Sequence, residues 1–155
     1  GADYVKAGLL GVKTCDQAEE MLKAIVRAVK DLDPKKKVVA SGYSDYLRVG
    51  SISPMLLPAA ASEAGADVVM VDTAIKDGKP TFDFMGEKDL ADFIELGHSN
   101  DLEVALAGSI GFPHLETLLR LQPDIIGVRG IVCGGVRRSA VKEELVVKVK
   151  SALER

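Results

Sequence analysis

Two lysines and one aspartate occupy positions where they could carry out proton-transfer chemistry. Lys6 interrupts the apolar run 4–9, and Asp72 and Lys76 follow the apolar run 68–71. A lysine among apolar residues needs a partner, and it can act as a general base, a Schiff-base amine or a phosphate ligand. A carboxylate near two lysines can hold one amine charged while burial makes the other a better base. These three residues are the candidate catalytic group, and a structural ion pair or a lysine that reaches the surface is the alternative.

Glycine-rich turns follow two of the later apolar runs. Gly108 and Ser109 come after the run 104–107, and Gly130 opens a second turn with two further glycines. After the seventh and eighth strands of (β/α)8 barrels, such turns present backbone N–H groups to a phosphate. Glycine also serves any tight turn, so a purely structural role is the alternative.

Arg129 ends an otherwise apolar run and therefore needs an anionic partner. We expect it to pair with Asp72 or with an anionic ligand. Arg137 and Arg138 are close enough in the sequence to add positive potential there. The candidate phosphate-binding residues are Gly108, Ser109, Arg129 and Gly130.

A repeated order of segments must position these residues. Gly-Ala-Asp-Tyr-Val at residues 1–5 recurs as Gly-Ala-Asp-Val-Val at residues 65–69, and residues 123–127 are a looser third copy. Because further apolar runs lie between these copies, the repeating unit is about 30 residues, the size of one βα unit. The predicted strands cover residues 3–8, 37–42, 67–72, 102–107 and 124–129.

Helix signals separate the predicted strands. Thr14 begins a capping-box pattern in front of an amphipathic segment. Ser53 and Pro54 predict another helix start, and Gly65 supplies a left-handed stop at its end. The remaining patterns are weaker and predict helices over residues 87–98, 113–121 and from 139 to the C-terminus.

Alternating strands and helices leave two architectures, an open doubly wound sheet or part of a (β/α)8 barrel. The dinucleotide fingerprint GxGxxG is absent after the first predicted strand, which disfavours a dinucleotide-binding sheet. The catalytic face of a barrel is formed by the C-terminal ends of its strands. The polar residues at those ends are Lys6, Tyr43, Asp72, Ser109 and Arg129. We therefore predict an α/β protein with the TIM-barrel fold, in which residues 1–155 form one domain and supply about the last five βα units.

Composition narrows the class of protein. The 155 residues are 47% hydrophobic and 28% charged, with a formal net charge of −3. This balance disfavours disorder and gives no basic footprint for nucleic acid or anionic lipid. The sequence shows no membrane span and no leader pattern, so we expect a cytoplasmic protein.

The two cysteines give no sign of a metal site. Cys15 and Cys133 form no CxxC pair, and no histidine is spaced to complete a zinc site. We expect two unrelated, buried or half-buried thiols in a reducing compartment. No cofactor or metal is predicted.

Four blocks of sequence resemble the (5-formylfuran-3-yl)methyl phosphate synthase family. They cover residues 1–6, 71–79, 105–110 and 127–133, and the block 71–79, with Asp72 and Lys76, is specific. The resemblance implies a TIM barrel that condenses two molecules of glyceraldehyde 3-phosphate through a Schiff base, with loss of phosphate and water. The product would be a furan precursor of methanofuran, a carrier in C1 metabolism, and the enzyme would be a carbon–oxygen lyase.

The resemblance also implies roles for individual residues. Lys6 matches the proton-accepting lysine of the family, and Asp72 and Lys76 match the acid and the amine of its active site. The Schiff-base lysine lies on an earlier strand than any in this chain. Val136 stands where the family pattern has aspartate, so the last loop departs from that pattern.

Two other readings remain open. The protein could be another phosphate-binding barrel enzyme, such as an isomerase or aldolase, or this chain could be an inactive fragment or scaffold. Five βα units account for five-eighths of a barrel of about 250 residues. We therefore expect that the chain alone is inactive and that its open sheet needs further residues or a partner chain. We expect a small phosphate substrate and a homo-oligomer.

Overall fold

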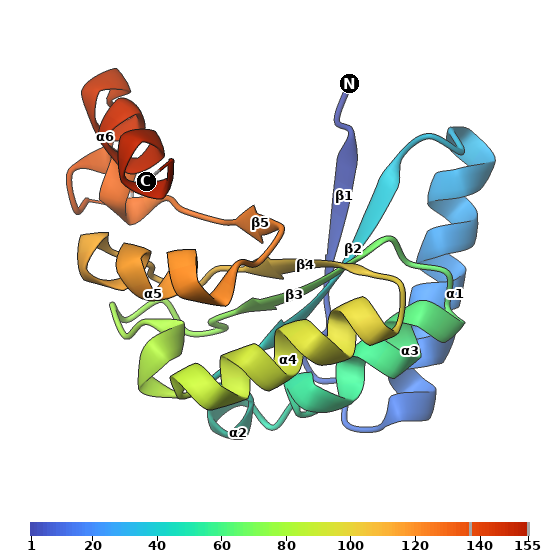
Figure 1. The fold of residues 1–155 in the computed structure, drawn as a ribbon. Coiled ribbons are helices and arrows are strands. Elements are labelled where there is room, and N and C mark those ends of the chain that lie inside the picture. Colours follow the sequence, from blue (N-terminus) through green and yellow to red (C-terminus); the bar gives the residue numbers. More distant parts are fainter. Residues whose placement is uncertain (137, 155) are drawn as a thin grey trace.

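The computed structural model describes residues 1–136 and 138–154, in which strands and helices alternate (Figure 1). The strands are β1 (Tyr4–Gly8), β2 (Lys37–Tyr43), β3 (Val68–Asp72), β4 (Glu103–Leu106) and β5 (Ile125–Ile126). The α-helices are α1 (Cys15–Leu32), α2 (Tyr46–Val49), α3 (Leu57–Glu63), α4 (Glu87–Ser99), α5 (Leu115–Leu121) and α6 (Glu143–Leu153). Short 3-10 turns are η1 (Pro54–Leu56), η2 (Thr81–Asp83), η3 (Phe112–His114) and η4 (Gly130–Cys133).

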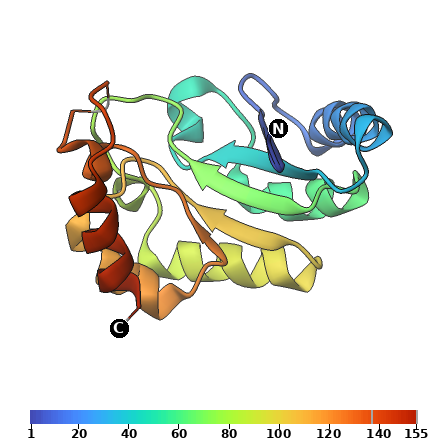
Figure 2. The ribbon, with the colours of Figure 1, turned by 90° about the horizontal axis from the view of Figure 1, so that it is seen from above.

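The order of the strands identifies the architecture. All pairs are parallel, and the sheet order β1-β2-β3-β4-β5 follows the chain. Each βαβ crossover is right-handed and leads to the next strand on the same side. The connecting helices therefore all lie on one face of the sheet, and such a sheet curls with its helices on the outside. Figure 2 shows the helices following an arc around the strands. In a doubly wound sheet, the strand order would change direction at one point within the sheet. The sequential order seen here therefore confirms the predicted barrel-type fold and excludes the doubly wound alternative.

The two faces of the sheet differ in what covers them. Alternate residues such as Ala40, Val69 and Leu106 point toward the helices and belong to the main core. On the opposite face, Val39, Val68 and Ala105 form a small second cluster. By strand register, the residues that share the second face include Lys6, Tyr43, Met70 and Asp72. The strands therefore turn their chemically active side chains away from the helices and toward the concave side.

The helix signals in the sequence are confirmed, with one refinement. The Thr14 hydroxyl accepts a hydrogen bond from the Gln17 N–H at the start of α1. The Ser53 hydroxyl caps the next segment, but that segment begins as the 3-10 turn η1 and becomes α-helical only at α3. Gly65 takes the expected left-handed conformation, with φ of 76°.

The C-terminal third differs most from expectation. Strand β5 has two residues where six were predicted, because the chain turns away after the Gly127 N–H binds the Leu106 carbonyl. The last helix begins at Glu143 instead of residue 139, and η4 precedes it. Helix α2 was not predicted.

The aspartate of the sequence repeat ties neighbouring strands together. Asp67 precedes β3, and its carboxylate accepts the Val38 N–H of β2 at 2.7 Å. Asp124 precedes β5 and accepts the Val104 N–H of β4 at 2.8 Å. A side chain from the helix before the neighbouring strand completes each group: Lys30 of α1 lies 2.9 Å from Asp67, and His98 of α4 lies 2.8 Å from Asp124. His98, near the end of its helix, therefore pairs with this carboxylate.

Two remaining sequence expectations concern the surface. No helix among residues 1–136 and 138–154 is long and apolar enough to cross a membrane. Cys133 is buried, as predicted, whereas Cys15 is exposed, because it occupies the first turn of α1 on its solvent side.

Candidate active site

The candidate catalytic residues come together on the concave side of the sheet. Asp72 is the last residue of β3, and Lys6 reaches it from β1, across β2. Lys76 lies four positions beyond Asp72, in the loop that follows β3. Asp72 thus comes from the C-terminal end of a strand and Lys76 from the loop beyond it, as expected for the C-terminal face of a parallel sheet. Lys6 was predicted at a strand end as well, but it is the middle residue of β1 and reaches Asp72 only through its long side chain.

Asp72 bridges the two ammonium groups through separate oxygens. Its Oδ2 atom lies 2.7 Å from Lys6 Nζ, and its Oδ1 atom lies 2.6 Å from Lys76 Nζ. The Oδ1 atom also accepts the Thr73 N–H at 2.8 Å, and the Thr73 hydroxyl accepts from Lys76 at 3.2 Å. The Asp72 side chain is 16% exposed, whereas Lys6 and Lys76 are 42% and 31% exposed. Solvent and substrate can therefore reach both amines while the carboxylate lies beneath them.

The protonation state of Asp72 follows from two opposing effects. Burial acts to raise the pKa of its carboxyl, but hydrogen bonds from Lys6 and Lys76 outweigh burial and lower the pKa below its ordinary value of 3.8. Asp72 is consequently a carboxylate at neutral pH. It can accept protons and hydrogen bonds and fix the two amines, but it cannot serve as a resting proton donor.

The predicted phosphate residues line one cavity with this group. The cavity has a volume of about 810 Å³ and lies where the loops after β3, β4 and β5 meet. Its lining includes Asp72, Lys76, Gly108, Ser109, Arg129 and Gly130. Lys6 is not among the lining residues and borders Asp72 from the β1 side. The volume is typical of a small-molecule site.

The turn after β4 has a backbone that only certain residues allow. Gly108 has φ of 96° and Ser109 has φ of 51°, both in the left-handed region. A Cβ atom on Gly108 would overlap the Thr81 hydroxyl and lie 2.9 Å from the Thr73 N atom. Thr81 is fully buried and donates to the Ala107 carbonyl at 2.6 Å. The turn is therefore packed against the loop that carries Lys76.

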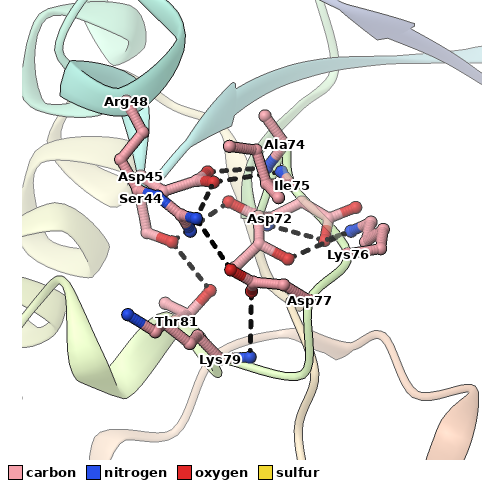
Figure 3. A network of polar contacts seen from close by, with 11 residues as sticks. Ser44, Asp45, Arg48, Asp72, Ala74, Ile75, Lys76, Asp77, Lys79 and Thr81 are labelled. Atoms are coloured by element: carbon pink, nitrogen blue, oxygen red, sulfur yellow. Dashed lines mark hydrogen bonds and ion pairs between the residues drawn. The ribbon is translucent and has the colours of Figure 1, made fainter.

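Several residues of this region were not singled out as site residues by the sequence. Figure 3 shows Ser44, Asp45 and Arg48, from the segment after β2, beside the loop that carries Lys76. Their only sequence signal was position, because they follow a strand at its C-terminal end. Tyr43 faces the same side as Asp72, and burial, with the anions Asp72 and Asp45, raises the pKa of its phenol. It is therefore neutral at physiological pH.

His114 and Phe82 pack against each other in the fold. His114 is half-buried: its ring stacks on Phe82 with centroids 4.7 Å apart, and its Nδ1 atom accepts a hydrogen bond from the Gly111 N–H. Burial lowers the pKa of this imidazole. Phe82 thus packs within the fold. Val136 is exposed, and Arg137 lies outside the described residues.

The chain is similar in sequence to a known protein family and to several curated proteins. A sequence model of the 4-HFC-P synthase family matches residues 1–150. A curated protein of Methanosarcina acetivorans, named (5-formylfuran-3-yl)methyl phosphate synthase, is 62% identical over 96% of this chain and 64% of its own length. The protein of that name from Archaeoglobus fulgidus is 58% identical over 99% of this chain and 65% of its own length. The chain thus spans slightly less than two-thirds of these relatives.

Solved structures support the fold. The 3-hexulose-6-phosphate synthase of Salmonella typhimurium superposes with a TM-score of 0.68 at 22% identity, over 99% of this chain and 63% of that one. The KGPDC structure from Streptococcus mutans gives a TM-score of 0.64 at 18% identity, over 100% of this chain and 62% of that one. This chain matches a part of each fold, which agrees with a partial barrel.

Proposed function

The chain belongs to the 4-HFC-P synthase family, and from that premise we propose that the whole protein makes (5-formylfuran-3-yl)methyl phosphate from two molecules of glyceraldehyde 3-phosphate. The proposal concerns the protein that includes the remaining third of its relatives' length. It places the enzyme in methanofuran biosynthesis. Because phosphate and water leave through broken C–O bonds, we class it as a carbon–oxygen lyase.

One observation carries the proposal: two amines share one ionised carboxylate beside a cavity with glycine turns and an arginine. Lys6 and Lys76 are both within 2.7 Å of Asp72. Asp72 and Lys76 line the cavity that also contains the turns after β4 and β5. Condensation of a triose phosphate needs a base at carbon and a positive environment for phosphate, and this arrangement supplies both.

Each residue has a distinct role in this reaction. Lys6 accepts the proton at carbon after its ammonium group has released a proton to solvent, and the Asp72 carboxylate fixes its amine in place. Because Asp72 is ionised, proton donation to a leaving hydroxyl falls to Lys76, the cation on the cavity side of Asp72. The Schiff base forms on a lysine of the part of the protein that this chain does not include. We therefore expect no turnover from this chain alone.

Phosphate is held on the other side of the cavity. Gly108, Ser109 and Gly130 bring the backbone close to the bound group, and Arg129 supplies charge. Two lysines and one aspartate leave a net positive charge in the catalytic group itself. That charge attracts an anionic substrate and favours it over a neutral one.

The test uses full-length enzyme and glyceraldehyde 3-phosphate, with furan formation followed by absorbance. Lys6→Arg keeps the positive charge but removes the proton acceptor, so the rate should fall by at least about 100-fold, a typical worth of a general base. Lys23→Arg, on the exposed side of α1, is the matched control and should leave the rate unchanged. Normal furan formation by Lys6→Arg would contradict the proposal.

Borohydride trapping separates the synthase from an isomerase. The wild-type protein should form a reducible adduct with glyceraldehyde 3-phosphate, and Lys6→Arg should also form it, because the imine lies on another lysine. If the wild-type protein is not trapped, Lys6 serves a reaction without a Schiff base and the synthase assignment is wrong.

A further inference from the structure

The loop that carries Lys76 has no helix or strand of its own between Asp72 and η2. A lysine side chain has four rotatable bonds. Its ammonium group therefore stays beside one particular oxygen only if the backbone that carries it is also held in place. Lys76 Nζ nevertheless lies 2.6 Å from Asp72 Oδ1. Something outside the loop must therefore hold residues 73–76 in place.

Asp45 holds this segment through both of its carboxylate oxygens. Its Oδ1 atom accepts the Ala74 N–H at 2.6 Å, and its Oδ2 atom accepts the Ile75 N–H at 3.0 Å (Figure 3). The Asp45 side chain is fully buried. Hydrogen bonds to a buried carboxylate are stronger and more directional than those between neutral groups. Asp45 therefore fixes the backbone N–H groups of the two residues that precede Lys76.

Arg48, in α2, fixes the far side of the same loop. Its Nη2 atom lies 2.7 Å from Asp77 Oδ2, and its Nη1 atom lies 3.7 Å from Asp45 Oδ2. The hydrogen bond from Arg48 lowers the pKa of the Asp77 carboxyl. Asp77 also accepts the Lys79 N–H, at 3.2 Å. Lys76 thus lies between two anchored points, one on each side in the sequence.

We infer that Asp45, assisted by Arg48, is a positioning residue that holds Lys76 against Asp72. Asp45 makes its hydrogen bonds to backbone N–H groups, so it acts on the reaction only through the position of Lys76. The inference deepens the proposed function, on which its kinetic part rests. Its alternative is that Asp45 merely stabilises the fold, in which case its effect would not depend on Lys76.

A double-mutant cycle in the full-length enzyme separates these alternatives. Asp45→Asn keeps the shape of the side chain but replaces one carboxylate oxygen by an NH2 group. That donor would face the N–H group of Ala74 or Ile75 and could not accept its hydrogen bond. We expect kcat to fall by about tenfold to a hundredfold, because the amine is misplaced. In a Lys76→Met background, the same change should lower kcat by less than about twofold. An equal fall in both backgrounds would overturn the inference.

The matched control is Asp67→Asn at the opposite end of the sheet. Asp67 also accepts a backbone N–H, from Val38, and also pairs with a lysine, Lys30. We expect it to lower stability comparably but to show no dependence on Lys76. If Asp45→Asn does not fold, Arg48→Met, a change at a one-third exposed side chain, carries the same cycle with the same expected dependence.

The titration of Asp72 gives a readout that does not need activity. Because Lys76 helps to lower the pKa of the Asp72 carboxyl, its displacement should raise that pKa. Carboxyl carbon NMR, assigned with Asp72→Asn, should show this rise in Asp45→Asn and in Lys76→Met, with no further rise in the double variant. An unchanged pKa in Asp45→Asn would overturn the inference. If the wild-type enzyme makes no furan, the proposed function fails while this titration still decides the role of Asp45.

Discussion

Lys6 Nζ lies 2.7 Å from Asp72 Oδ2, although 66 positions separate the two residues in the sequence. The pair joins β1 to β3 on the concave side of the sheet. Asp72 uses its other oxygen for Lys76. One carboxylate therefore sets the position of both amines, so a change at Asp72 should disturb more than a change at either lysine.

Replacing Asp72 by asparagine should affect stability as well as activity. Asp72→Asn leaves two ammonium groups facing a neutral amide with one acceptor. Because solvent reaches both amines and screens the two ion pairs, we expect a loss of about 1 kcal/mol. Urea unfolding measures this loss. In the Lys6→Met, Lys76→Met double variant, the same substitution should cost much less, and an equal cost there would contradict the ion-pair explanation.

The contribution of Asp72 to stability should depend on pH in a defined range. Its folded-state pKa lies below the ordinary 3.8, so the ion pairs contribute fully above that value and are lost as the pH falls through the folded-state pKa. Unfolding free energies of the wild type and Asp72→Asn, measured from pH 7 to pH 2, should differ by a constant amount above about pH 5 and converge below 3.8. A difference that grows on acidification would show the opposite sign of the shift.

The turn after β4 should tolerate no side chain at Gly108. A Cβ atom there would overlap the Thr81 hydroxyl, and the positive φ adds strain. We expect Gly108→Ala to cost about 1–3 kcal/mol, as overpacking does. Gly130→Ala is the matched control, because a Cβ atom at Gly130 meets nothing within 4 Å, and it should change stability by less than about 0.5 kcal/mol. Thermal unfolding of the two variants compares them directly, and equal losses would contradict the packing argument.

The repeated aspartates should differ in importance according to their contacts. Asp67→Asn weakens the acceptor of the Val38 N–H and the contact with Lys30, so we expect a loss of about 1–3 kcal/mol. The side chain of Asp3, at the same place in the repeat, is 88% exposed and lies 3.5 Å from Lys36. Asp3→Asn should therefore change the stability of this chain by less than about 0.5 kcal/mol. Denaturant unfolding measures both losses. Equal losses for Asp67→Asn and Asp3→Asn would contradict the explanation by contacts.

Local patterns in the amino-acid sequence were enough to predict the units of the fold and the kinds of residue at its active end. Apolar runs, the repeated order of segments and helical periodicity are local patterns, so they placed five βα units correctly, apart from the bounds of β5 and of the last helix. The rule that chemistry lies at the C-terminal ends of parallel strands selected Lys6, Asp72 and Lys76, although Lys6 is the middle residue of β1.

Which atoms meet depends on the long-range contacts of the folded chain. The register of β1, β2 and β3 brings Lys6 to Asp72, and the curl of the sheet brings the turns at Gly108 and Gly130 to one cavity. Asp45 reaches the loop of Lys76 across 29 positions, from the irregular segment after β2. Such contacts depend on the path of loops and on the sum of long-range packing, which no local pattern of residues encodes. The sequence therefore indicated which residues could do the chemistry, and the folded chain decided what holds them in place.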